Sequence, residues 1–157
     1  MTQVATQDEE LQDLYRELIL DHARSPRHFG KLDGTTHSAD GINPLCGDKL
    51  RICFRVDRDN RIADAKFEGT GCAISVASAS LLTDAVIGLP VTDAMHMFDA
   101  VTASLTGNDL DSPDMDIGKL RALQGVREFP ARVKCATLAW HAMNSALHHN
   151  QQPATTE

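Results

Sequence analysis

Two stretches of alternating apolar and polar residues, separated by a short turn, place the strongest limit on the fold of this chain. Residues 50–56 carry apolar side chains on one face and arginines, together with Cys53, on the other. Residues 61–68 alternate in the same way after a turn at 57–60. Strict alternation is typical of half-buried strands, so the pattern predicts a β-hairpin with one face against the core.

Most of the remaining chain carries helical patterns. The expected helices cover residues 9–23, 74–87, 92–105, 117–124 and 133–148. Residues 35–42 are polar and predict an edge strand. Because the strands come early and the helices later, the order predicts an α+β sandwich. Its small antiparallel sheet of three strands would have the helices packed mainly on one face.

Length and charge exclude several classes of protein. The 157 residues are enough for one domain, expected over 1–150, with a disordered tail over 151–157. No apolar run is long enough to span a membrane, and the polar start MTQVATQDEE does not resemble a secretory signal. We therefore expect a cytoplasmic protein. The net charge of -7 argues against general binding to nucleic acid or to an anionic membrane.

The four cysteines are the candidate reactive groups. Their wide spacing and the absence of an export signal argue against a disulfide framework. Cys46 lies in a turn before the hairpin, Cys72 precedes a helix, and Cys135 is expected in the first turn of the last helix. Free N–H groups at such positions favour a thiolate, which suits a metal ligand or a nucleophile. Cys53 lies in the middle of a strand, where a packing role is expected.

Asp48 stands two residues after Cys46 in the stretch NPLCGDKL. Three thiolates and one carboxylate would form a tetrahedral site of the kind that zinc prefers. A carboxylate ligand also exchanges more readily than a fourth thiolate, which suits a site that must open. Spacing alone leaves this assembly open, because the chain has no CxxC motif and each cysteine could equally be a small buried side chain.

Four stretches give the chain a close resemblance to the U-type iron–sulfur assembly proteins, the IscU/SufU family. They are LYRELILDHARSPRHFG, NPLCGD, FEGTGCAISVASASLLTD and ARVKCATLAWHAM. Together they extend from Leu14 to Met143. Lys134 stands where the IscU branch has a histidine, and residues 107–130 resemble the insertion of the SufU branch. Both features resemble SufU rather than IscU. The resemblance also implies that the fold is the NifU-like sandwich of the family.

The resemblance implies a zinc site formed by Cys46, Asp48, Cys72 and Cys135. It also implies a partner, a cysteine desulfurase of the SufS type, which would offer a histidine to the zinc and displace Cys46. The freed thiolate would take the persulfide sulfur and pass it to a downstream iron–sulfur scaffold or a reductant. Arg132 would orient or stabilise the Cys46 thiolate. This is a zinc-dependent activity of the sulfurtransferase kind, exerted together with the desulfurase.

A second function remains open on the same residues. Cys46, Cys72 and Cys135 could instead hold a nascent [2Fe–2S] or [4Fe–4S] cluster, which would make the protein a scaffold. Lys134 and the insertion favour sulfur transfer over this alternative. A purely structural zinc site is disfavoured, because Asp48 is a poor ligand for a permanent site.

Overall fold

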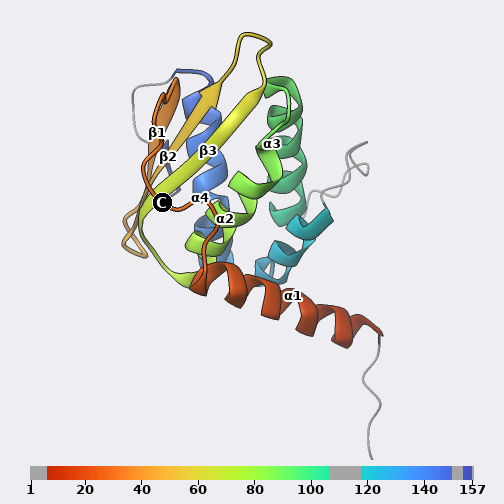
Figure 1. Ribbon diagram of the computed structural model, residues 1–157. Helices are drawn as coiled ribbons and strands as arrows, with labels where there is room; N and C mark the ends of the chain where they lie inside the picture. The colour runs from red at the N-terminus through yellow and green to blue at the C-terminus, as the bar shows by residue number, and fades with distance from the viewer. Residues whose placement is uncertain (1–6, 107–117, 150–153, 157) are drawn as a thin grey trace, which may run out of the picture.

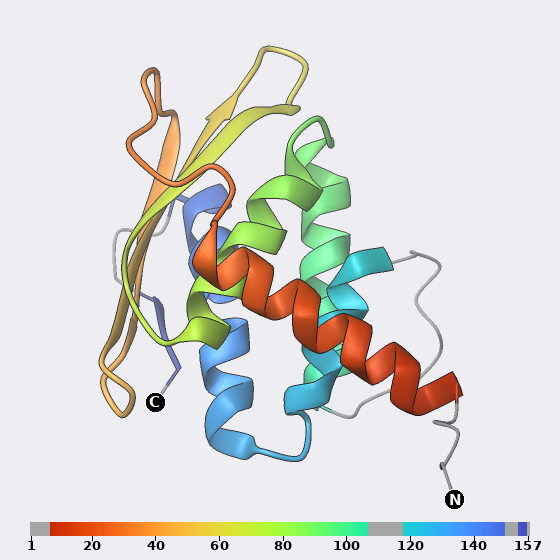
Figure 2. The ribbon, with the colours of Figure 1, turned by 60° about the horizontal axis from the view of Figure 1, so that its bottom comes forward.

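The chain folds into a sheet layer and a helix layer in the computed structural model, which describes residues 7–106, 118–149 and 154–156 (Figure 1). The strands are β1 (His37–Asn43), β2 (Asp48–Val56), β3 (Ile62–Thr70) and β4 (Ala154–Thr155). The helices are α1 (Gln7–Arg24), α2 (Ala73–Val86), α3 (Val91–Thr106), α4 (Pro130–Leu147) and the 3₁₀ helix η1 (Gly118–Val126). Figure 2 shows the helices on one side of the sheet. The α+β sandwich is therefore confirmed.

The sheet has one strand more than expected. Its order is β3-β2-β1-β4, with antiparallel pairing among β1, β2 and β3 and parallel pairing between β1 and β4. The added strand, β4, comes from the tail that we expected to be disordered. It is only two residues long and too polar to give an alternation signal, whereas residues 151–153 and 157 lie outside the described part of the chain.

Strand β2 determines which side chains face the helices. Its buried positions alternate along the whole strand and include Leu50, Ile52 and Phe54. The same alternation extends back to Asp48, so a carboxylate occupies the first inward position of an otherwise apolar row. Asn43, the residue paired with Asp48 in the β1–β2 register, also faces inward. Two polar groups therefore close one end of the apolar core.

Helices α2 and α4 pack against each other and against the sheet. The fully buried Trp140 of α4 donates its indole N–H to the Ser78 hydroxyl of α2 at 3.1 Å. That hydroxyl in turn donates to the backbone carbonyl of Ala136 at 2.6 Å. Buried polar groups of this kind must be paired, so the chain of bonds fixes how the two helices lie relative to each other. It also fixes the position of Cys135, one residue before Ala136.

Helix α4 begins at Pro130, three residues before the expected start. Proline is favoured in the first turn because its missing N–H would have no helical partner there, and Phe129 precedes it as the N-cap. The expected short helix at 117–124 is a 3₁₀ helix, η1. Of the predicted insertion 107–130, residues 107–117 lie outside the described part of the chain.

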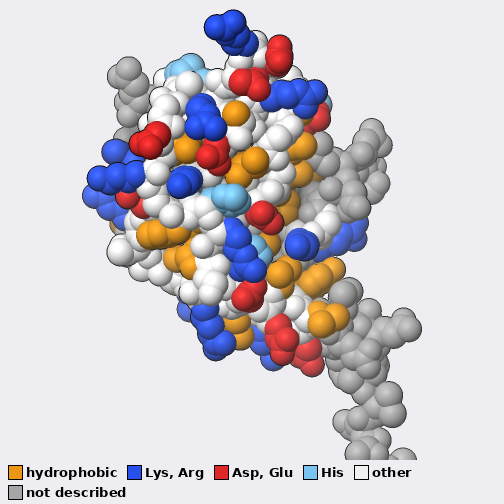
Figure 3. Space-filling view, in the orientation of Figure 1, with side chains coloured by type: hydrophobic (Ala, Val, Ile, Leu, Met, Phe, Trp, Pro, Cys, Tyr) orange, Lys and Arg blue, Asp and Glu red, His pale blue; other side chains and the backbone are white. Residues whose placement is uncertain are grey.

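Basic and acidic side chains are interspersed over the face that is visible in Figure 3. None of the helices in the described ranges has both the length and the apolar character needed to cross a bilayer.

Candidate metal centre

Cys46 and Asp48 are brought together by the turn that joins β1 to β2. The Cys46 N–H bonds to the Asn43 carbonyl oxygen at 3.3 Å, which closes the turn. Gly47, between the thiol and the acid, has φ +73°, a left-handed conformation that residues with a Cβ rarely adopt. The turn leaves the Cys46 side chain exposed and directs Asp48 into the core.

The Asp48 carboxylate is buried but receives two strong hydrogen bonds. Its side chain is 1% exposed. The Cys72 backbone N–H donates to Oδ1 at 2.8 Å, and the Ser75 hydroxyl donates to Oδ2 at 2.6 Å. Both donors come from the start of α2, where free N–H groups are expected. These bonds offset part of the cost of burying an acid, and they fix its orientation.

Cys72 lies beside this carboxylate at the N-cap of α2. Its Sγ is 3.9 Å from Asp48 Oδ2 and 3.7 Å from the Ser75 hydroxyl oxygen. Gly71 makes this approach possible, because a Cβ at that position would lie 3.1 Å from Asp48 Oδ1. Gly71, the second glycine of the GTGC stretch, thus allows close packing around the acid.

Cys135 reaches the same place from α4. It is fully buried, and its Sγ lies 3.3 Å from the Cys46 Sγ. It sits in the second turn of the helix rather than the expected first turn, because Pro130 starts the helix earlier. Burial raises the pKa of the Cys135 thiol, and its hydrogen-bonding neighbours in the site raise it further. In the second turn, Cys135 lies beyond the first turn of α4, where a helix N-terminus has its main effect.

Ligand atoms of Cys46, Asp48 and Cys135 all lie within 4.8 Å of one another. Among the described residues, this is the one group of three or more such side chains that could hold a metal ion. Cys72 lies just outside the group, although its sulfur is close to the carboxylate. Cys53 lies on the outer face of β2, half-buried and apart from these residues.

Arg132 lies near two of the thiols. The neighbouring thiols of Cys72 and, secondly, Cys135 raise the pKa of its exposed guanidinium. Because the sulfur atoms of Cys135 and Cys46 are 3.3 Å apart, Arg132 lies in the region of the thiols, and its expected role at Cys46 stays a prediction.

Two further residues of the centre were not singled out from the sequence. Asn43 is fully buried, and its Nδ2 donates to the Cys135 Sγ at 3.7 Å, a long bond to sulfur. Its Oδ1 has no hydrogen-bond partner among the described residues. Ser75 holds Asp48, as described above. Strand alternation would have directed Asn43 inward, and helical spacing places Ser75 one turn after Cys72.

The donors fit zinc. Zinc prefers tetrahedral sites of thiolate, imidazole and carboxylate ligands. Two thiolates at about 2.3 Å from one zinc ion would be about 3.8 Å apart, close to the 3.3 Å between Cys46 and Cys135. A cation would also offset the cost of a buried carboxylate next to buried thiols.

Known proteins share this sequence and fold. Residues 14–153 match the family described as NifU-like N terminal domain. The zinc-dependent sulfurtransferase SufU of Bacillus subtilis is 43% identical over 87% of this chain and 91% of its own length. The iron–sulfur cluster assembly scaffold protein IscU of Streptococcus pyogenes is 39% identical over 87% of this chain and 84% of its own length.

Solved structures agree with these relatives. The crystal structure of FiSufU from Fervidobacterium islandicum superposes with a TM-score of 0.77 and 33% identity, over 83% of this chain and 94% of that one. A NifU-like N-terminal structure from Brucella abortus, 24% identical, covers 89% of this chain and 96% of that one at a TM-score of 0.77, which shows the shared fold. The chain belongs to the NifU-like N-terminal domain family of iron–sulfur cluster assembly proteins, in its SufU branch.

Proposed function

We propose that this protein is a zinc-dependent sulfur carrier, which accepts a persulfide sulfur on Cys46 from a SufS-type cysteine desulfurase. The observation that carries the proposal is the exposure of Cys46 within a group of metal ligands whose other members are buried or half-buried. A thiol in this position can meet a second protein without unfolding the site. The similarity to a relative named zinc-dependent sulfurtransferase supports the same function.

Four residues would hold the zinc ion: Cys46, Asp48, Cys72 and Cys135. Zinc would supply a positive charge that keeps the thiols deprotonated at neutral pH. Asp48 is held by hydrogen bonds from Cys72 and Ser75, so its carboxylate stays in place when Cys46 moves. Cys135 is held inside α4 and receives the Asn43 N–H. The protein thus anchors Cys135 and Asp48 and leaves Cys46 free to swing outward on its turn.

The sulfur transfer itself needs no added oxidant. The Cys46 thiolate attacks the terminal sulfur of the partner's persulfide, and a new S–S bond forms to Cys46. The S–S bond of the partner breaks, and its cysteine leaves as a thiolate. The product is a persulfide on Cys46, which a downstream iron–sulfur scaffold would then accept.

The surroundings of Cys46 suit an encounter with another protein. Leu45, its neighbour on the turn, is 73% exposed. Exposed apolar side chains next to a reactive group are common at protein contacts. Arg132 would stabilise a thiolate in this region through its guanidinium. We propose a cytoplasmic location, since all four thiols are unpaired.

The test is an assay of alanine release from cysteine by a SufS-type desulfurase, with and without the purified protein. We expect about one zinc ion per chain and a clear stimulation of the desulfurase. Mass spectrometry should find one added sulfur on Cys46. Cys46→Ala should abolish both stimulation and sulfur acceptance.

Cys53→Ala is the matched control, since it removes a thiol outside the metal centre and should change neither readout. A stable iron–sulfur chromophore after anaerobic purification, with no stimulation of the desulfurase, would show that the protein is a cluster scaffold instead. Loss of stimulation in Cys53→Ala would show that Cys46 is not the specific acceptor.

A further inference from the structure

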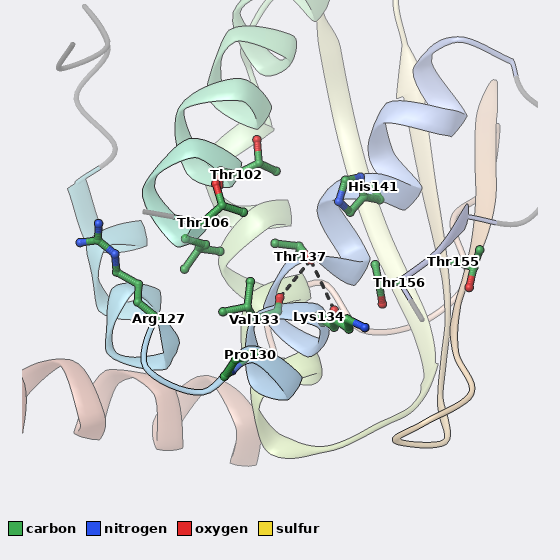
Figure 4. A pocket seen from close by; sticks show the side chains of 11 residues that line it. Thr102, Thr106, Arg127, Pro130, Val133, Lys134, Thr137, His141, Thr155 and Thr156 are labelled. Atoms are coloured by element: carbon green, nitrogen blue, oxygen red, sulfur yellow. Dashed lines mark hydrogen bonds between the residues drawn. The ribbon is translucent and has the colours of Figure 1, made fainter. Parts of the chain in front are cut away.

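A second candidate site lies in a hollow of about 590 Å³ between α3, α4 and β4 (Figure 4). One face of α4 lines it, with Pro130, Val133, Lys134, Thr137 and His141 at helical spacing. None of these residues belongs to the metal centre, which faces a different side of α4. The volume is in the range of small-molecule sites.

The hollow has a basic side chain, Lys134, in its α4 wall. Among the lining residues that the structure describes, none is an aspartate or a glutamate. The whole chain, by contrast, has a net charge of -7. Pro130, also in the lining, is the first residue of an 18-residue helix, whose N-terminus adds positive potential. A negatively charged group is the favoured occupant.

A buried hydroxyl in the lining lacks a partner. The Thr156 side chain is 8% exposed, and its Oγ1 has no hydrogen-bond partner in the described part of the chain. The backbone N–H of Thr156 donates to the carbonyl oxygen of Ile42 in β1. An unpaired buried hydroxyl is unfavourable, so such groups usually have a ligand or an ordered water as partner. Thr156 and Lys134 both line the hollow, one from the C-terminal segment and one from α4 (Figure 4).

Much of the remaining wall is apolar or already hydrogen-bonded. Leu105 and Val133 provide aliphatic surface. The hydroxyls of Thr102, Thr106 and Thr137 donate to carbonyls of their own helices. The His141 imidazole adds a further polar group to the wall beside Lys134 and Thr156. An occupant would thus have one polar end and an apolar body.

We propose that this hollow binds a small organic anion, with a carboxylate or phosphate head between Lys134 and Thr156 and a short aliphatic body against Leu105 and Val133. The ammonium group and the hydroxyl would both donate to oxygens of the head, which gives the orphan hydroxyl its partner. This site is separate from the metal centre and does not depend on sulfur transfer.

The test is an NMR titration of the full-length, zinc-loaded protein with four probes: butyrate, butyl phosphate, inorganic phosphate and butylamine. We expect saturable shifts of the Lys134, Thr137 and Thr156 amides with butyrate or butyl phosphate, and the tighter of the two identifies the head group. Inorganic phosphate should bind more weakly because it lacks the apolar body. Butylamine should produce no such shifts.

Thr156→Val removes the hydroxyl at nearly constant volume and should weaken binding about tenfold. Lys134→Met should do the same, and Lys134→Arg should retain most of the affinity. Thr106→Val is the matched control, because its hydroxyl is already bonded within α3, and it should bind as the parent does. If Thr156→Val does not fold, Lys134→Met decides the question.

Three results would overturn the proposal. One is the absence of saturation with either anion, and another is an equal response to butylamine. The third is unchanged affinity in Thr156→Val, which would mean that water alone pairs with this hydroxyl.

Discussion

Cys46 and Cys135 have their sulfur atoms 3.3 Å apart, but their surroundings are opposite. Cys46 is exposed on a turn next to a glycine. Cys135 is fully buried inside a helix and receives an N–H from Asn43. The two side chains are chemically identical, so any difference in their behaviour must come from the structure around them.

The difference indicates that the two thiols have separate roles within the candidate metal centre. A buried thiol held by a rigid helix cannot reach a partner protein, but it can anchor a metal ion. An exposed thiol on a turn can leave the metal with little rearrangement. The predictions below test these separate roles of Cys135 and Cys46, from the largest expected effect to the smallest.

The sharpest test compares the zinc affinities of Cys135→Ala and Cys46→Ala. Cys135→Ala removes the anchor and should weaken zinc binding by more than about 100-fold, since even outer-shell changes cost 10–100-fold. Cys46→Ala should retain much of its zinc, because the other three ligands stay in place. Competition with a chromophoric chelator measures both values, and circular dichroism checks that each variant is folded. Equal losses of zinc affinity in the two variants would contradict separate roles for the two thiols.

Asp48→Ala should produce the next largest effect. It removes a ligand that two hydrogen bonds hold in position, and it leaves the Ser75 hydroxyl without its acceptor. We expect zinc binding to weaken by about 100-fold, with a matching loss of desulfurase stimulation. Asp40→Ala on β1, an acid paired with Arg51 on the outer face of the sheet, is the control. Unchanged zinc affinity in Asp48→Ala would rule out a ligand role.

Alkylation of the metal-free protein tests the same comparison without any metal. Burial raises the pKa of the Cys135 thiol, so little thiolate is present there at pH 7. Cys46 is exposed and should react with iodoacetamide at least about tenfold faster. Peptide mapping after short reaction times gives both rates. The rate at Cys135 should increase further above pH 8, because its thiol deprotonates only at high pH, and similar rates at pH 7 would show that burial does not protect it.

Asn43→Ala should have the smallest effect. It removes the N–H that Cys135 receives, whereas the other contacts of this thiol remain. We expect zinc affinity to fall about tenfold, the lower end of the range for outer-shell groups. Ser38→Ala, at an exposed position of the same strand, should leave the affinity unchanged. An Asn43→Ala affinity equal to that of the parent would mean that the long N–H contact to sulfur contributes nothing.

The fold was largely predictable, because its main signals are local. Alternation identified β2 and β3, and helical spacing identified α1 to α4. The prediction was wrong where local signals are weak. Strand β4 is two residues long, and its pairing with β1 depends on a segment more than 100 positions away in the sequence. The predicted start of α4 at residue 133 was three residues late, because Pro130 belongs to the first turn of the helix, where proline is favoured.

For the candidate site, the resemblance indicated four ligands, and the structure brings ligand atoms of three of them, Cys46, Asp48 and Cys135, within 4.8 Å of one another. That these residues bind a metal ion stays a prediction. Asn43 was missed although it begins the quoted NPLCGDKL stretch, because its importance depends on Cys135, 92 positions later. The role of Arg132 at Cys46 stays a prediction, although its guanidinium lies close enough to Cys72 and Cys135 for these thiols to raise its pKa.

The sequence by itself determined the secondary structure, the family and the set of reactive side chains, because these depend on residue type and short spacing. Only the tertiary structure decided which thiol is exposed and which is buried, and that Thr156 and Lys134 line one hollow. Burial and close contact arise from the packing of segments that are distant in the chain, so residue type and local spacing could not have assigned them. The reactivity of a cysteine depends on its burial and on its close contacts, which is why four identical side chains here are expected to behave differently.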